Sequence, residues 1–413
     1  MVEQFHPLMA NNIIGQDAAL ATLTDGLLKG AAKHHAWLLT GPKGVGKASL
    51  AYHMVVNLLS HDENNDGMVM VPKDNISVEE KKSILPDDGL DLFGDELPDE
   101  PIKNFVEQTV DDTPRPPLSS KEDIVKQLRE QAHPHFLLLD KNSTDGDGGE
   151  DDIKPKPRET KKTQITVGMV RKISSFLAFH GFDKNLPRLV VIDGAEDMNS
   201  AAANALLKNL EEPPPNAIFF LISHRPGLLP ATIRSRCFIL PLHPLPFDKT
   251  LHLLAELLPT IDPIEKNAVA TLSAGRLGRA AEIYSESGLN MYRDWLDFFM
   301  LSGHQQADKK KKILTSLLAQ ENMNRFQLFL SLVEEFFLRL ARYDKKILND
   351  NFFAGEEKIF QLFLARHHLS QWLEFWHIQK MFFNNGFAPK NLNRDYLLVQ
   401  LLDETREALL PLA

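Results

Sequence analysis

The nine-residue segment GPKGVGKAS, at positions 41–49, has the glycine and lysine spacing of a loop that binds phosphate groups. Such a loop points backbone N–H groups at phosphate oxygens, while its lysine neutralises the β and γ phosphates. The residues that supply these parts are Gly41, Gly44, Gly46 and Lys47. The pattern next requires Ser or Thr, whose hydroxyl ligates Mg²⁺, but Ala48 stands there. The segment therefore leaves binding of ATP or ADP open, predicts impaired metal placement and assigns no required cofactor.

A second candidate group is the acidic cluster in VVIDGAED, which follows a buried-type apolar run. Asp193 is placed to hold Mg²⁺ through water, and Glu196 or Asp197 to orient an attacking water. The alternative is that Asp193, Gly194 and Asp197 only form a turn between a strand and a helix. The segment alone leaves both interpretations open, and the phosphate-type loop upstream favours shared ancestry with nucleotide-binding enzymes.

The segment TIRSRC, at positions 232–237, places Arg234 and Arg236 between two apolar stretches. Arginine at such a position is most often a solvated surface charge. The alternative is a side chain that projects into a neighbour's nucleotide site and stabilises the phosphoryl group during transfer. Taken alone, the segment favours the surface charge.

Alternating strands and helices must position these residues. AWLLT, at positions 36–40, and the apolar runs that end at Asp193 and Ser223 are expected to be buried strands. Apolar residues recur at helical spacing in three segments, at positions 48–59, 166–180 and 199–212. Continuous apolar strands alternating with helices predict an α/β domain with a parallel sheet and helices on both faces.

After Pro241 the strand signals largely vanish, and amphipathic helical patterns follow. A chain of 413 residues is too long for one ordinary core. We therefore expect three units: a nucleotide-binding-like domain over residues 1–242, a small helical unit over 243–288 and a larger helical unit over 289–413.

Composition limits the class of protein. The net charge of −10 argues against a chain that binds nucleic acid mainly through its overall field. The single cysteine, Cys237, excludes an internal disulfide framework and a Cys-rich zinc site. No apolar run reaches the length of a bilayer span, and the first residues lack the features of a signal peptide. We therefore expect a cytoplasmic protein without membrane contact.

Two stretches of the first domain differ in composition from the rest. Residues from about 61 to 118 and from 141 to 162 are acidic and rich in Gly, Pro and Ser. Such sequence has too little apolar surface to offset the entropy lost on ordering. We interpret both stretches as largely mobile insertions in the first domain.

Five segments, in a fixed order, carry a resemblance to a known family: IIGQ, GPKGVGK, HPHFLLLD, VVIDGAEDMNSAAANALLKNLEEPP and TIRSRC. On these residues the chain resembles the delta-prime family of subunits of the bacterial DNA polymerase III clamp loader, which are AAA+ proteins. The resemblance covers the first domain apart from its insertions, and LNRDYLLVQLLDE near the end resembles the family's last helix. LLKNLEEPP and SRC are the most specific of these segments.

The resemblance implies an AAA+ phosphate-loop domain, a helical lid over residues 243–288 and a helical oligomerisation collar over 289–413. It implies a clamp-loader subunit of the DNA polymerase III holoenzyme that helps to load the sliding clamp on primed DNA. The implied partners are the clamp-loader ATPase subunits and the delta subunit. By the same resemblance, Arg236 is an arginine finger offered to a neighbouring ATPase subunit, and Ser223 is a polar sensor. The rival interpretations are an autonomous ATP-hydrolysing AAA+ motor and a scaffold in which Arg236 is inert.

Two departures from the family pattern bear on activity. Many members carry four cysteines of a zinc module after the first helix, and this chain has none there, so we expect no zinc. Active members carry a second sensor arginine in a Gly-x-x-Arg pattern, where this chain has Gly278 with Arg276 and Arg279 on either side. Together with Ala48, this mismatch predicts that the chain has no ATPase activity of its own. By the resemblance, it would still be part of a nucleotidyltransferase complex.

Deleting most of residues 61–118 and 141–162 is expected to leave the thermal midpoint nearly unchanged, because these stretches have little apolar surface to bury. The measurement compares thermal unfolding of the deletion variant with that of the full chain. Strong hydrogen-exchange protection across both stretches in the full chain would contradict the prediction.

Overall fold

The computed structural model describes residues 13, 15–28, 34–60, 120–141, 143, 164–179, 186–318, 323–347, 353–384 and 394–409. The two predicted insertions lie outside these residues, apart from Lys141 and Ser143. The prediction made for them therefore stays a prediction.

Five parallel strands form one sheet in the spatial order β2-β3-β4-β1-β5. The strands are β1 (Ala36–Thr40), β2 (Phe136–Leu139), β3 (Arg188–Asp193), β4 (Ala217–Ser223) and β5 (Phe238–Pro241). Because every neighbouring pair is parallel, the carboxyl ends of all five strands lie at one edge of the sheet. That edge is where α/β sheets of this kind bind ligands.

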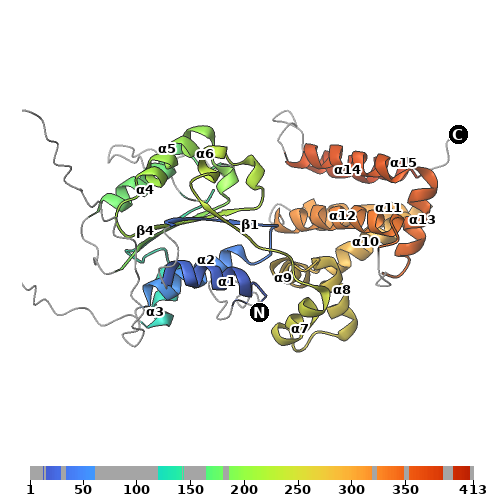
Figure 1. The fold of residues 1–413 in the computed structure, drawn as a ribbon. Coiled ribbons are helices and arrows are strands. Elements are labelled where there is room, and N and C mark those ends of the chain that lie inside the picture. Colours follow the sequence, from blue (N-terminus) through green and yellow to red (C-terminus); the bar gives the residue numbers. More distant parts are fainter. Residues whose placement is uncertain are drawn as a thin grey trace, which may run out of the picture.

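Helices cover both faces of the sheet (Figure 1). On β1, Trp37 and Leu39 pack into one core, while Ala36 and Leu38 pack into the other. The first core includes α1 (Asp17–Leu23), α2 (Lys47–Leu59) and α3 (Lys121–Arg129), and the second includes α4 (Val167–Ala178), α5 (Ser200–Glu211) and α6 (Ala231–Arg234). A strand that is apolar at every position is explained by burial on both sides. This arrangement confirms the predicted parallel sheet with helices on both faces.

Side-chain caps fix the starts of three of these helices. Ser120 accepts a hydrogen bond from the N–H of Asp123 at the start of α3, and Thr166 caps α4 in the same way. Asn199 accepts from the N–H of Ala202 at 2.8 Å and begins α5. These caps satisfy N–H groups that have no partner inside the helix.

The elements described after β5 are all helices, which confirms the predicted fold class. Three helices follow the sheet, namely α7 (Phe247–Leu257), α8 (Pro263–Ser273) and α9 (Leu277–Ser285). Six more follow them: α10 (Gly288–Met300), α11 (Gly303–Leu318), α12 (Met323–Asp344), α13 (Glu356–Arg366), α14 (Leu369–Asn384) and α15 (Arg394–Glu407).

One buried apolar cluster runs through this helical part, from Leu254 in α7 to Leu409 after α15. The cluster does not divide at residue 288, so the predicted boundary between the two helical units stays a prediction. None of the helices in the described part of the chain is both long and apolar enough to cross a membrane.

The start of α9 packs directly on the loop after β1. The N–H of Gly278 donates to the carbonyl oxygen of Gly44 at 2.9 Å. A Cβ atom at Gly278 would lie 3.0 Å from the Cα of Gly44, and one at Gly44 would lie 2.8 Å from the backbone nitrogen of Arg279. Glycine at both positions therefore allows the two backbones to touch.

A buried charge cluster ties the same helix to α12. Glu335 is only 1% exposed and pairs with Arg279 at 3.2 Å, Arg276 at 3.5 Å and Arg342 at 3.0 Å. Arg279 also donates to the carbonyl oxygen of Ser331 at 2.7 Å. Burial raises the pKa of Glu335, against the opposing effect of Arg342 and Arg276. We call these four charged residues the Glu335 cluster; it holds α9 against α12.

Glu335→Ala is expected to lower the free energy of unfolding by roughly 3–5 kcal/mol, because it leaves buried arginine charge without its carboxylate. The measurement is denaturant unfolding of the full chain. The matched control is Glu334→Ala, which removes a half-exposed partner of Lys380 and should change stability by less than about 1 kcal/mol. Equal shifts for the two variants would be inconsistent with a structural role of the cluster.

Candidate nucleotide site and arginine finger

The loop between β1 and α2 has the strand and helix context of a phosphate loop. Gly41, Gly44 and Gly46 have φ angles of +139°, +82° and +104°, which L side chains rarely adopt. All three glycines predicted for the site are therefore required by the turn itself. Their presence accounts for the shape of the loop before any ligand is considered.

Lys47 is the first residue of α2, and its ammonium group faces its own loop. Nζ donates to the carbonyl oxygens of Gly41 at 2.6 Å and Pro42 at 2.7 Å, and the residue is only 3% exposed. Burial lowers the pKa of Lys47 to about 8, against the opposing effect of Glu196 and Asp193. The side chain must leave both carbonyl groups before it can neutralise a phosphate.

The predicted acidic and polar residues gather at the carboxyl edge of the sheet. Asp193 ends β3, Ser223 ends β4, and Glu196 lies in the short 3-10 helix Ala195–Asp197. Glu196 accepts a hydrogen bond from the backbone N–H of His224 at 2.9 Å. Burial pushes the pKa of Glu196 upward, but hydrogen bonds from backbone N–H groups and from Ser223 outweigh it and hold the pKa below its ordinary value. Glu196 is therefore a fixed, charged carboxylate.

Asp193 is in a contrasting environment. Burial and the nearby Asp140 raise the pKa of Asp193, while Lys47 opposes the shift. The structure thus brings Lys47, Asp193, Glu196 and Ser223 to one edge, as the sequence predicts. Whether these residues act on a nucleotide stays a prediction.

The two arginines beside Gly278 direct their guanidinium groups to Glu335 on α12 and not to the phosphate loop. Ala48, which replaces the metal-ligating hydroxyl, packs against the apolar core on the α2 side of the sheet. The features that the resemblance associates with a weak nucleotide site therefore have structural roles here.

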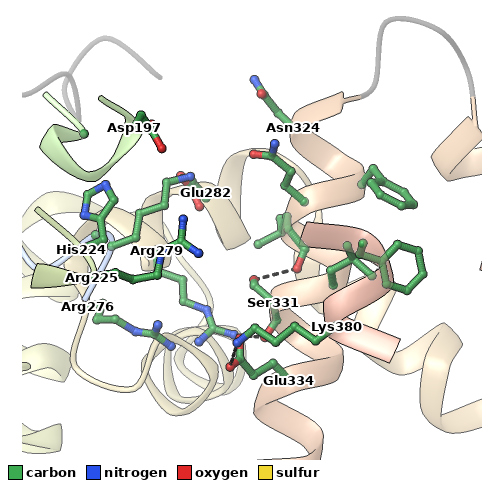
Figure 2. Close-up of a pocket in the computed structure, with 18 of the residues that line it drawn as sticks. Asp197, His224, Arg225, Arg276, Arg279, Glu282, Asn324, Ser331, Glu334 and Lys380 are labelled. Carbon is green, nitrogen blue, oxygen red and sulfur yellow. Dashed lines mark hydrogen bonds and ion pairs between the residues drawn. The ribbon is translucent and has the colours of Figure 1, made fainter. Parts of the chain in front are cut away.

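A cavity of about 1040 Å³ lies between the carboxyl edge of the sheet and helices α9, α12 and α14 (Figure 2). Its lining includes residues that the motif analysis did not single out, among them Asp140, His224, Arg225 and Lys380. Asp140 directly follows β2, and His224 and Arg225 directly follow β4. The positions of Asp140, His224 and Arg225 just after parallel strands are the sequence signal that could have identified them. Lys380 has no such signal, because α14 is brought to the cavity by helix packing.

His224 is neutral at physiological pH. Burial lowers its pKa to about 4, Lys47 adds to this effect, and Glu196 opposes it. Its Nδ1 atom is buried and makes no hydrogen bond within the part of the chain that the structure describes. A protonated imidazole at this position would place a second positive charge beside Lys47.

Arg236 follows α6 and does not line the cavity. Its Nη1 donates to the carbonyl oxygen of Thr232 at 2.9 Å, and its Nη2 pairs with Glu211 at 2.6 Å. The side chain of Arg236 is 36% exposed. The neighbouring Cys237 is more buried, and burial raises the pKa of its thiol to about 12. The guanidinium is thus accessible to a neighbouring molecule rather than directed into the chain's own cavity.

The described residues include no group of three or more His, Cys, Asp or Glu side chains that could hold a metal ion. The absence of zinc was expected because the region after the first helix lacks cysteine. That expectation stays a prediction.

Sequence comparisons connect this arrangement with known proteins. Residues 99–246, which include β2 to β5 and Arg236, match a family described as "DNA polymerase III, delta subunit". The "DNA polymerase III subunit delta'" of Haemophilus influenzae is 36% identical over 138 residues, which are 33% of this chain and 41% of that protein. Over these residues the chain is similar to delta-prime subunits of DNA polymerase III. This finding confirms the resemblance carried by the sequence motifs.

Two further delta-prime subunits give the extent of the similarity. The Escherichia coli protein is 31% identical over 173 residues, covering 39% of this chain and 51% of that protein. The Pseudomonas aeruginosa protein is 28% identical over 211 residues, covering 51% of this chain and 44% of that protein. The matches thus span about half of each relative or less. Among solved structures, a DNA polymerase III gamma subunit-related protein from Thermotoga maritima is 22% identical over 70% of this chain and 90% of that chain, with a TM-score of 0.29.

Acidification from pH 6.5 to pH 4 is expected to destabilise the chain through His224. Its pKa is lower in the folded protein than in the unfolded chain, so the unfolded chain binds more protons throughout this window. His224→Gln should therefore reduce the loss of stability between pH 6.5 and pH 4, measured by denaturant unfolding at several pH values. The control is His304→Gln at an exposed position. An unchanged pH dependence in His224→Gln would show that His224 does not contribute.

Proposed function

We propose that the chain is a clamp-loader subunit of the DNA polymerase III holoenzyme. In this proposal it helps to load the sliding clamp on primed DNA, in the cytoplasm. The relatives named DNA polymerase III subunit delta' support the replication role. The partners would be the clamp-loader ATPase subunits and the delta subunit, with the clamp and primed DNA reached through the complex.

The observation that carries the proposed division of labour is the contrast between Lys47 and Arg236. Lys47 is buried and donates to two carbonyl groups of its own loop, whereas Arg236 is partly exposed outside the cavity. A chain that hydrolyses its own ATP needs its loop lysine on the phosphates. A chain that assists a neighbour needs an accessible cation on its surface. The geometry favours the second role, with Arg236 as an arginine finger that acts in trans.

A guanidinium group suits this task because its planar fork of donors can hold two phosphate oxygens and stays charged. In the transition state of phosphoryl transfer, negative charge is spread over the three equatorial oxygens, and an arginine beside them stabilises that charge. Arg236 would approach the ATP bound to the adjacent subunit and add this charge to a site completed by both chains. Lys47, Asp193, Glu196 and Ser223 would form a degenerate site that contributes no turnover.

The alternative function is an autonomous AAA+ motor. It is favoured by the phosphate loop and by the fixed carboxylate of Glu196. It is opposed by Ala48 and by the pairing of Arg276 and Arg279 with Glu335. The two functions make opposite predictions for the purified chain.

The isolated chain is expected to hydrolyse ATP negligibly, because Ala48 provides no metal ligand and no second sensor arginine faces the loop. Ala48→Ser alone should not restore turnover. The measurement is phosphate release by the purified chain with Mg²⁺, together with nucleotide binding with and without Mg²⁺. The Lys47→Ala variant reports any contaminating ATPase. Turnover that is robust in the unmodified chain and lost in Lys47→Ala would favour the autonomous motor.

Arg236→Ala is expected to leave assembly intact and to lower DNA- and clamp-stimulated ATPase activity and clamp loading by the reconstituted complex. Arginine fingers contribute about 10³ to 10⁵ in rate in other nucleotide hydrolases. The remaining sites of a multi-site complex would dilute the loss. Lysine lacks the planar fork, so Arg236→Lys should rescue little.

Arg234→Ala is the matched control, because Arg234 lies two residues away in the same segment and should matter less. Assembly of every variant is checked by size before loading is measured. Normal loading by assembled Arg236→Ala complexes would exclude the finger and favour the scaffold.

A further inference from the structure

Glu211 is the last residue of α5, and its carboxylate contacts the proposed finger. Oε1 of Glu211 lies 2.6 Å from Nη2 of Arg236. On the other side, Nη1 of Arg236 donates to the carbonyl oxygen of Thr232 in α6. The guanidinium thus contacts two elements, α5 and α6, that pack against each other (Figure 1).

The two contacts differ in what they can do for the side chain. The Thr232 carbonyl lies four residues before Arg236 and moves with the same turn of chain. Glu211 lies on a separate helix whose apolar face, including Leu206 and Leu210, is buried against the sheet. The carboxylate therefore orients the guanidinium relative to the sheet and not only relative to its own segment.

The ion pair between Glu211 and Arg236 is weak enough for Arg236 also to bind a phosphate group. Glu211 and Arg236 are 47% and 36% exposed, and ion pairs as exposed as this one stabilise a protein only weakly. Such a pair biases the rotamer of the arginine without trapping it. Nε of Arg236 makes no hydrogen bond that the structure records among the described residues, so donors remain for phosphate oxygens.

We propose that Glu211 is a positioning residue for Arg236, which rests on the proposed function of Arg236 as a finger acting in trans. An exposed arginine side chain without a partner loses substantial rotamer entropy when it binds a ligand in one geometry. Glu211 restricts the side chain before the neighbour's ATP arrives, so less entropy is lost in the transition state. The carboxylate acts through Arg236 and does not touch the nucleotide.

The test uses the reconstituted clamp loader with variants of this chain, and it measures stimulated ATPase activity over a range of ATP concentrations. Glu211→Ala is expected to lower kcat about two- to fivefold and to leave KM unchanged, because the finger acts on the transition state. Glu211→Gln keeps an oxygen that can accept the same hydrogen bond and should recover most of the rate. Glu212→Ala, at the adjacent exposed position, is the matched control and should behave as the unmodified chain.

The double variant separates positioning from a general structural effect. If Glu211 acts only through Arg236, adding Glu211→Ala to Arg236→Ala causes no further loss. A further loss, or a Glu211→Ala complex with unchanged kcat beside an impaired Arg236→Ala complex, would overturn the positioning role and leave the finger in place. An Arg236→Ala complex with normal activity would overturn both proposals.

Discussion

The backbone contact between Gly44 and Gly278 fixes where the helical part of the chain lies relative to the sheet. A side chain at either position would collide with the other backbone, and the hydrogen bond from Gly278 sets the spacing. A second link lies nearby, where the side chain of Gln16 donates to the carbonyl oxygens of Val45 and His243. The phosphate-type loop thus helps to hold together the segments that contain Gln16, His243 and Gly278, whether or not it binds a nucleotide.

Buried charged residues restrict the packing of the helical part to one arrangement. The Glu335 cluster lies where α9 meets α12, and Arg339 and Glu356 form a second buried pair at 2.6 Å in the helical core. A buried ion pair adds little stability over well-packed apolar residues, but removing one partner is costly. A shift of one helix against the other would leave such a charge unpaired. The arginines beside Gly278 are therefore engaged in holding the helical part in one register.

Helix α5 connects the two candidate functional regions of the α/β domain. It begins at the Asn199 cap, three residues after Glu196 at the carboxyl edge, and it ends at Glu211 beside Arg236. Its 12 residues correspond to a rod of about 18 Å at 1.5 Å per residue. Because its apolar stripe is buried against the sheet, the carboxyl edge and the exposed arginine belong to one packed unit.

The sequence by itself determined three of the buried strands, the glycine loop and the gathering of Asp193, Glu196 and Ser223 at one edge. These features follow from local rules: apolar periodicity, short-range hydrogen bonds and the shared direction of parallel strands. Only the tertiary structure decided the partners of the charged side chains. Pairs such as Arg279 with Glu335 and Glu211 with Arg236 join residues far apart in the sequence, and the pKa of His224 depends on burial by several elements. Local periodicity carries no information about such pairs. Long flexible side chains form these ion pairs only after packing has brought their backbones together.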